Sequence, residues 1–324
     1  MSVAFTRRTC LFAASAFVAM PLRAQATYPT KPITLIVPFA PGGIADITAR
    51  TVAQAMGASL GQTIVVDNRP SAGSIVASQA VAKAAPDGYT LLLMSNANAV
   101  SASLFKKLPF DALKDFAPIG TLGFFELVIC VSRESRFKTL RELIAHGKAN
   151  PGKLTLATIN VGSTQHLSAE LFKSRTGIDA VVVPYKGSPA VITALRGGEV
   201  DVAFEILGPT LAQITSGAVR ALAVTGDQRN AALPEVPTAV EQGVANYDVE
   251  SWNALATPAG TPQPVIERLN RAVQETLAQA DVKKRLADLG VRAKGGTPAQ
   301  QASLLASEIK RWHEVIVAAR IEPQ

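Results

Sequence analysis

The sequence predicts an α/β protein of two lobes, each built on a parallel sheet with helices on both faces. Its 324 residues, 48% hydrophobic and 18% charged, suffice to fill two cores. Residues 33–94 alternate strand, helix, strand, helix and strand with short connections. Residues 154–224 show the same alternation without repeating the first sequence. This alternation is typical of parallel sheets.

The first strand is predicted at residues 33–37, where β-branched and aliphatic side chains follow one another without alternation. Such a run is expected of a strand covered on both faces. Pro41, Gly42 and Gly43 then allow a sharp turn without bulky side chains. Apolar residues recur at helical spacing from Ile44, so a helix begins near Gly43 or Ile44.

The loop from Phe39 to Gly43 therefore leads into a helix N-terminus. The first amides of a helix have no partner within it, and the helix dipole makes that end slightly positive, so a carboxylate can bind there. A tight connection without a ligand is the alternative interpretation of the same loop. Asp46 also has two interpretations: it pairs with an amino group of a ligand, or it favours the helix dipole and bonds to loop amides.

A second strand at residues 63–66, a helix at 71–85 and a third strand at 90–94 complete the first series. A polar loop at residues 95–98, which begins with Ser95 and Asn96, is predicted to follow the third strand. Ligand loops of a parallel sheet lie at the carboxyl ends of its strands, so these two residues are expected to border the same site as the first loop.

Residues 108–123 are read as irregular, and a strand at 126–132 is expected to carry the chain out of the first lobe. Thr139 and Glu142 have the spacing of a capping box, which predicts a helix start. The second lobe then consists of strands at 154–158, 180–183, 200–204 and 220–224, with helices at 163–175, 189–196 and 209–216.

In the second lobe, the loop at residues 159–162 again leads from a strand into a helix. Ser163 or Thr164 can cap that helix and also donate a hydroxyl hydrogen bond to an anion. His166 lies in the first helical turn, where the dipole disfavours protonation, so a neutral hydrogen-bonding role is expected. Two such loops predict a cleft that binds a small acid from both lobes.

The last hundred residues contain a strand at 252–256 and helices at 264–280, 281–289 and 298–319. These helices are expected to pack on the outside as structural clamps. The predicted boundaries are residues 27–125 plus about 226–324 for lobe 1, and about 126–225 for lobe 2.

Residues 1–26 are predicted to be an export signal. Arg7 and Arg8 precede an apolar stretch at residues 11–20, and residues 24–26 form a small-residue cleavage site. The arginine pair leaves the general and the twin-arginine routes open. Without this leader the chain keeps Cys130 as its single cysteine, so no internal disulfide is expected.

The charge of the chain argues against a nucleic-acid partner. Of the formal net charge of +7, the leader contributes three arginines, which leaves +4 on the mature chain. The sequence contains no run of Lys and Arg and few aromatic residues among them, unlike nucleic-acid-binding surfaces.

Short motifs rich in proline, glycine and aromatic residues follow one another along the mature chain. They include VPFAPGG at 37–43, NRP at 68–70, APDGYT at 85–90, VPYKG at 183–187 and PAGTP at 258–262. In this order they resemble the Bug, or TctC-like, extracytoplasmic solute receptors of tripartite tricarboxylate transporters. The similarity covers the whole mature chain.

The resemblance implies a periplasmic, type II (Venus-flytrap) binding fold, in which two lobes joined by two hinge strands close on a solute. In that family the two strand-to-helix loops hold a ligand carboxylate, largely through backbone amides and ordered water. These roles carry over to Phe39, Ala40, Gly42, Gly43 and Asp46 on one side of the cleft, and to Gly162, Ser163, Thr164 and His166 on the other, with Ser95 and Asn96 at its border.

Three positions depart from the usual family pattern. Ala40 stands where a proline is common, Ile44 where a small polar residue is common, and Glu205 where an Asp-Asn pair often follows the strand. Glu205 has two interpretations, recognition of donor groups on a ligand or a bond to a neighbouring backbone group. Tyr185 follows a buried strand and can reach the cleft. The ligand class stays open among di- or tricarboxylates, amino acids and aromatic acids.

The expected function is a monomeric periplasmic receptor that captures a small organic carboxylate and docks on the membrane subunits of a tripartite tricarboxylate-type transporter. No cofactor, metal or catalytic residue is expected. A receptor that serves a signalling partner is one alternative.

A periplasmic α/β hydrolase is the other alternative. The sequence has no Gly-x-Ser-x-Gly elbow, P-loop or dinucleotide-binding fingerprint, and its three histidines lack metal-ligand spacing. Ser163 and His166 lie three positions apart at a helix start, which capping and anion binding explain better than a catalytic triad.

Overall fold

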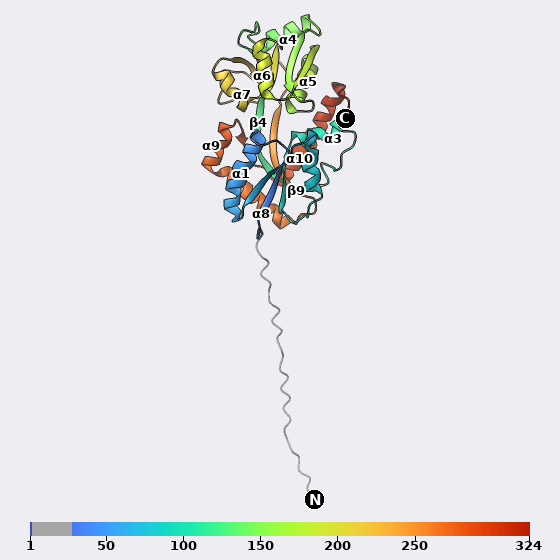
Figure 1. The fold of residues 1–324 in the computed structure, drawn as a ribbon, viewed down its shortest axis with the longest axis vertical. Coiled ribbons are helices and arrows are strands. Elements are labelled where there is room, and N and C mark those ends of the chain that lie inside the picture. Colours follow the sequence, from blue (N-terminus) through green and yellow to red (C-terminus); the bar gives the residue numbers. More distant parts are fainter. Residues whose placement is uncertain (2–27) are drawn as a thin grey trace.

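The computed structural model describes Met1 and residues 28–324, so the predicted export signal lies, apart from Met1, outside the described residues. Strands from the described residues form one curled array that β4 (Phe116–Ser132) divides into two sheets. Residues 116–126 of β4 pair in the first sheet, and residues 127–132 pair in the second. In Figure 1, β4 rises from the lower half of the molecule into the upper half.

The first sheet has the order β2-β1-β3-β9-β4, with the short β10 on the far side of β4. Its strands are β1 (Ile33–Val37), β2 (Ile64–Asn68), β3 (Thr90–Ser95), β9 (Glu250–Pro258) and β10 (Arg292–Ala293). The first three strands pair in parallel, which confirms the predicted first series. β9 is antiparallel to both of its neighbours.

The second sheet repeats this arrangement with the order β6-β5-β7-β4-β8. Its strands are β5 (Leu154–Ile159), β6 (Ala180–Tyr185), β7 (Val202–Ile206) and β8 (Val219–Val224). β5 pairs in parallel with β6 and β7, so the predicted second series is confirmed. The chain returns to the first sheet through residues 225–249, where Thr225 bonds both to Leu127 of β4 and to Val249.

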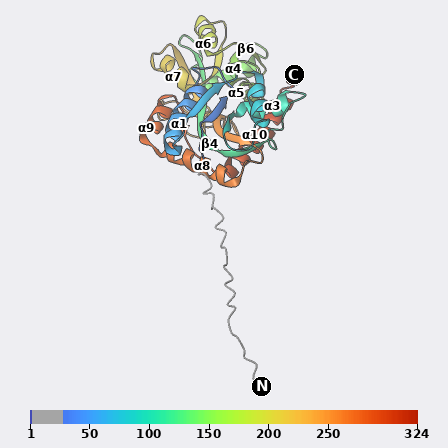
Figure 2. The ribbon, with the colours of Figure 1, turned by 60° about the horizontal axis from the view of Figure 1, so that its bottom comes forward.

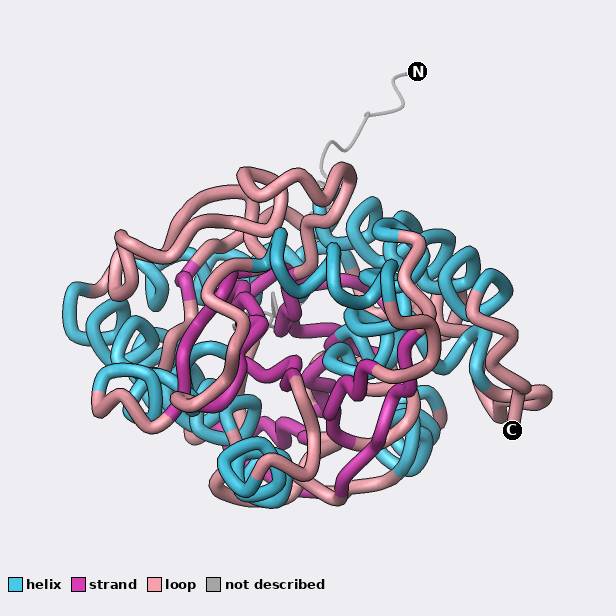
Figure 3. Tube along the Cα trace, turned by 90° about the horizontal axis from the view of Figure 1, so that it is seen from above, coloured by secondary structure: helices cyan, strands magenta, loops and turns pink. Residues whose placement is uncertain are grey.

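Helices surround the sheets. Figure 1 shows α4 (Leu140–Ala149), α5 (Thr164–Thr176), α6 (Ser188–Gly197) and α7 (Leu207–Thr215) around the second sheet. Around the first sheet lie α1 (Ile44–Leu60), α2 (Ile75–Ala82), α3 (Asn96–Leu104), α8 (Gln263–Ala278), α9 (Ala280–Asp288) and α10 (Pro298–Ala318). Figure 2 keeps α6 and α7 at the opposite end from α8, and Figure 3 shows strands inside and helices outside.

Two parts of the sequence prediction are wrong. Residues 108–123 are not irregular throughout, because β4 begins at Phe116 and pairs with β9 along residues 116–126. Prolines and glycines hide this strand in the sequence, and the pairing shifts register at Pro118/Gly120 and Thr121/Gly123, as expected of bulges. The polar residues after β3 are not a loop either, since α3 starts at Asn96.

The predicted helix start at Thr139 is confirmed, because its hydroxyl accepts a hydrogen bond from the Glu142 amide. The reciprocal half of the capping box differs. The Glu142 carboxylate accepts from the Lys138 amide, one residue before the cap.

Apolar packing joins the two halves. One cluster of buried residues contains Ile36 and Leu92 of the first sheet together with Leu156 and Phe204 of the second. The C-terminal helix α10 packs on α3 and also contacts α5. None of the helices in the described part of the chain combines the length and apolar character needed to cross a bilayer.

Candidate functional site

The loop between β1 and α1 presents backbone amides. Gly42 has a φ of +85°, in the left-handed region that favours glycine. Gly43 is the N-cap of α1 in extended conformation, and no side chain among residues 28–324 caps this helix. The amides of Ile44, Ala45 and Asp46 find no acceptor in that part of the chain. Three amides are thus free at the positive end of a 17-residue helix, as an anion site requires.

Asp46 holds this loop in place. Its carboxylate accepts from the Gly42 amide (2.9 Å), from the Asn68 side chain (2.8 Å) and from Arg50 Nε (3.0 Å to both oxygens). The residue is only 2% exposed. Burial acts to raise its pKa, but these hydrogen bonds outweigh burial and lower the pKa. Both oxygens are occupied, which supports the structural interpretation of Asp46 over pairing with a ligand amine.

Asn68 completes the anchor, and sequence reasoning assigned it no role. Its side-chain amide also donates to the Phe39 carbonyl at 3.0 Å. The signal for it was the NRP motif at the end of the second strand. Its side chain therefore ties the end of β2 to the loop after β1.

Ser95 and Asn96 begin α3 and have different partners. The Ser95 hydroxyl accepts from the Ala97 amide at 3.2 Å, so it caps the helix. The Asn96 side-chain amide donates to the Glu250 carbonyl at 3.2 Å and to Thr164 Oγ1 at 3.4 Å. Asn96 therefore connects α3 to the return strand β9 and to α5 of the second half.

The loop between β5 and α5 packs on the first half. Gly162 has a φ of +81°, and a Cβ atom there would lie 2.3 Å from Leu104 Cδ2 of α3. The Ser163 hydroxyl accepts from the His166 amide and donates to the Ile159 carbonyl, both at 3.1 Å. Ser163 thus caps α5 as predicted, and its proton is already used. The free donors at this helix are the amides of Thr164 and Gln165, which have no acceptor among residues 28–324.

The pKa of His166 is lowered, which is the expected direction, but the main cause is burial and not the helix dipole. The side chain is 6% exposed. Its Nδ1 has no hydrogen-bond partner among the described residues. The Ser163 hydroxyl bonds to the backbone amide of His166 and not to the imidazole, so the pair does not form a catalytic dyad.

Tyr185 is the last residue of β6 and Glu205 the next-to-last residue of β7, and these two strands flank β5 in the second sheet. Tyr185 is half-buried and packs against an apolar cluster that includes Val191 and Leu195 of α6. Glu205 is 1% exposed, and Ser188 donates to its Oε2 at 2.6 Å. Burial raises the pKa of Glu205 to about 7. Its Oε1 has no hydrogen-bond partner among residues 28–324.

The two halves also touch at α7. A Cβ atom on Gly208 would lie 2.1 Å from the Leu289 carbonyl oxygen, and one on Gly290 would lie 2.6 Å from Gly208 Cα. Beside this contact, a cavity of about 570 Å³ is lined by both halves, with Phe124, Glu126 and Glu250 among its walls. None of the site residues predicted from the sequence lines this cavity.

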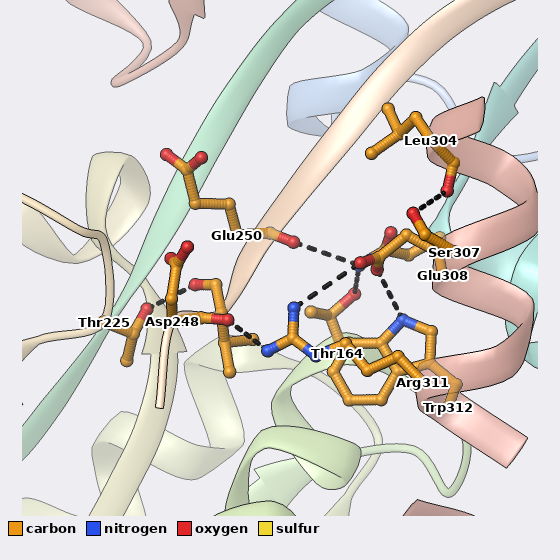
Figure 4. A network of polar contacts seen from close by, with 11 residues as sticks. Thr164, Thr225, Asp248, Glu250, Leu304, Ser307, Glu308, Arg311 and Trp312 are labelled. Atoms are coloured by element: carbon orange, nitrogen blue, oxygen red, sulfur yellow. Dashed lines mark hydrogen bonds and ion pairs between the residues drawn. The ribbon is translucent and has the colours of Figure 1, made fainter. Parts of the chain in front are cut away.

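A polar network at the return strand was missed by sequence reasoning (Figure 4). Arg311 of α10 donates to the Asp248 carbonyl and contacts the Glu308 carboxylate at 3.4 Å. The buried Trp312 indole donates to the other Glu308 oxygen at 2.7 Å. These contacts fix α10 against the chain just before β9. The contact between Arg311 and Asp248 joins residues 63 positions apart, which local patterns do not reveal.

The chemistry of the site is that of binding. No group of three or more His, Cys, Asp or Glu residues suited to a metal ion occurs in the described part of the chain. Cys130 is buried in β4, and burial raises the pKa of its thiol, so it is a weak nucleophile. Free helix amides at two loops are suited to hold an anion without reacting with it.

Comparisons with known proteins point to one group. The sequence profile of the tripartite tricarboxylate transporter family receptor matches residues 48–321. Protein BugT of Bordetella pertussis is 40% identical over 308 residues, which cover 94% of each chain. Periplasmic binding protein BugD is similar in structure, with 33% identity and a TM-score of 0.79 over 92% of this chain and 100% of that one.

Two further structures contain ligands. Rpa4515 of R. palustris with adipate has 32% identity and a TM-score of 0.81, covering 92% of this chain and 100% of that one. MatC of Rhodopseudomonas palustris with bound malate has 33% identity and a TM-score of 0.76, covering 89% of this chain and 100% of that one.

Proposed function

We infer that this chain, which belongs to the tripartite tricarboxylate transporter receptor family, captures a small organic carboxylate between its two lobes. The family resemblance and the two-lobed fold predicted from the sequence are both confirmed. Members of this family are periplasmic solute-binding proteins, and two neighbours hold adipate and malate. A role in transport follows from the family.

The observation that carries the proposal is the free N-terminus of α1. Its first amides lack acceptors among residues 28–324, while Asp46 and Asn68 fix the loop that presents them. A carboxylate satisfies several such amides at once and is stabilised by the helix dipole. The side chain of Ile44 has no polar atom, so at this position only the backbone amide can donate a hydrogen bond to the ligand.

The second lobe supplies a matching set of donors. The amides of Thr164 and Gln165 are free at the start of α5, next to the Asn96 contact that links the two halves. A ligand that bonds to both helices favours the shut arrangement over an open one, and this difference in affinity drives closure. We place the boundary between the lobes where β4 changes partners, between Glu126 and Leu127, and at Thr225 on the return.

We assign the predicted site residues three kinds of role in this proposal. Gly43 provides an amide at the first loop, while Phe39, Ala40 and Gly42 shape that loop. Thr164 and His166 face the ligand from α5. Asp46, Ser95 and Ser163 position the loops by capping and anchoring. The shut form docks as a monomer on the membrane subunits of a tripartite transporter.

Ile44→Pro tests the amide site. Ile44 is the first residue of α1, where proline is well tolerated, and Gly43 before it has the extended conformation that proline prefers. The substitution removes one free amide and keeps the helix. Loss of a hydrogen bond to a charged group costs about 1.5–3 kcal/mol, so affinity falls roughly tenfold to hundredfold.

Thermal unfolding of residues 27–324 with carboxylates, amino acids and neutral sugars measures this effect. A ligand at about one hundred times its dissociation constant adds about 2.7 kcal/mol, a shift of several degrees. Ile44→Ala is the control, because it shortens the same side chain and keeps the amide. The proposal is refuted if Ile44→Pro and Ile44→Ala lose the same amount of ligand-induced stabilisation, or if only neutral sugars raise the unfolding midpoint.

A further inference from the structure

Glu205 lies where three loops meet at the carboxyl edge of the second sheet. It is the next-to-last residue of β7, and it contacts Ser188 at the start of α6. The side chain of Gln165, in the first turn of α5, lies close enough to lower the pKa of Glu205, although no hydrogen bond between the two side chains meets normal geometry. The next residue, Ile206, packs against the apolar cluster of the first half, to which Phe39 and Ile44 also belong.

The charge of Glu205 is not compensated by the protein. The groups around it are the neutral Ser188, Gln165 and the Ile206 amide, and the other titratable group facing it is Cys130 of β4. No Lys, Arg or His among the described residues forms an ion pair with it. Burying an ionised carboxylate without a cation costs free energy, and this cost is reduced either when the carboxylate takes up a proton or when a cation on a ligand pairs with it.

One oxygen of this carboxylate is free to accept. Ser188 occupies Oε2, whereas Oε1 has no partner among residues 28–324. At the interface between the halves, Asn96 Oδ1 is a second acceptor without a partner in that part of the chain, and the ring nitrogen Nδ1 of His166 also has no partner there. The buried unsatisfied groups from both halves therefore call for a ligand that carries donors as well as a carboxylate.

We propose that Glu205 binds the ammonium group of an amino-carboxylate ligand whose carboxylate occupies the N-terminus of α1. This inference rests on the proposed function and narrows its substrate class. An ammonium supplies both the missing positive charge and a donor for Oε1, whereas a hydroxyl supplies only the donor. A plain dicarboxylate supplies neither and brings a second negative charge toward Glu205.

Matched pairs of ligands that differ only in the ammonium group test this inference. We would measure dissociation constants by calorimetry for L-alanine and propionate, L-aspartate and succinate, and L-glutamate and glutarate. In at least one pair the amino compound is expected to bind tenfold or more tightly than its partner. Glu205→Gln, which keeps shape and hydrogen bonding, is expected to reduce that ratio to about one. Glu199→Gln removes an exposed charge from the same half and serves as control.

Protonation gives a second readout on the unaltered protein. Glu205 must be ionised to pair with an ammonium, so affinity for the amino compound rises from pH 6 to pH 8 and binding releases a proton near pH 7. Binding of propionate, succinate or glutarate does not show this release. Because proton release is measured on the unaltered protein, it tests the role of Glu205 even if the Glu205→Gln variant does not fold.

Three results would overturn the inference. The desamino compounds bind as tightly as the amino compounds in every pair, or the preference survives in Glu205→Gln, or no proton is released. In these cases carboxylate binding itself is intact and the proposed function stands. Absence of binding by all six compounds counts against the proposed function and the inference together.

Discussion

Gly208→Ala is predicted to weaken ligand binding without weakening the fold. Gly208 lies in the first turn of α7 and touches the chain after α9, which belongs to the other half of the molecule. The added Cβ would lie 2.1 Å from the Leu289 carbonyl oxygen and 2.8 Å from its carbon, both of them backbone atoms. A backbone contact of this kind cannot be relieved by a change of rotamer.

The size of the effect follows from this geometry. Cβ atoms essentially never approach other heavy atoms within 3.0 Å, so the halves must separate here by about 0.9 Å. We expect the ligand-bound, shut arrangement to keep this contact and the open arrangement of the free protein to lack it, so the substitution disfavours closure alone. Alanine favours helix over glycine by up to about 1 kcal/mol, so the free protein becomes no less stable. We expect affinity for the ligand to fall at least tenfold, about 1.4 kcal/mol.

Calorimetry with the tightest ligand, together with the unfolding midpoint of the free protein, measures the two effects separately. Gly197→Ala is the matched control, because it makes the same change in α6, where the nearest heavy atom is a flexible Glu199 side chain at 3.9 Å. Unchanged affinity in Gly208→Ala would show that this contact is not part of the ligand-bound arrangement. A lower midpoint in the free protein would show that the halves do not separate without cost.

Three further predictions concern single residues. Asp46→Ala removes the anchor of the first loop and is expected to lower the free energy of unfolding, measured by urea denaturation, by about 2 kcal/mol. Because the folded pKa of Asp46 is lowered, its stabilisation is present above the unfolded pKa and is lost as the pH falls. A difference in stability between Asp46→Ala and the unaltered protein that does not change with pH would contradict this prediction. The folded pKa of Glu205 is raised to about 7, so the free protein is expected to lose up to about 3 kcal/mol of stability as the pH rises from 5 to 8. Glu205→Gln should remove this dependence of stability on pH. If the variant keeps the same dependence, Glu205 is not its cause. Arg311→Met is expected to speed hydrogen exchange at residues 244–249 but not in β1, and equal change in both would indicate a global loss of stability instead.

Local patterns predicted the parts of the fold that depend on local chemistry. The buried strand β1 appeared as a short apolar run, and the loops after β1 and β5 appeared as turns that lead into helices. The cap of α4 was visible as a threonine three positions before a glutamate. The order of short motifs along the chain was sufficient to identify the family.

Elements that depend on distant partners were predicted poorly. The first part of β4 contains one proline and two glycines that argue against a strand, yet β9 pairs with it along residues 116–126. β10 has two residues and exists only through its pairing with β4. The start of α3 was read as a loop because its residues are polar, although Ser95 and Asn98 form a capping box there. Tertiary pairing outweighed local propensity in the two strands.

The sequence by itself determined where strand-to-helix loops with free amides occur, since a strand, a sharp turn and a helix start within a few residues leave the first helix amides without partners inside the helix. Only the tertiary structure decided which side chains remain available at those loops. Asp46 and Ser163 are occupied by neighbouring groups, whereas one oxygen of Glu205 is left without a partner among residues 28–324. The reason is physical: burial and hydrogen bonding depend on groups brought together from across the chain, as in the bond between Asn96 and Glu250, 154 positions apart.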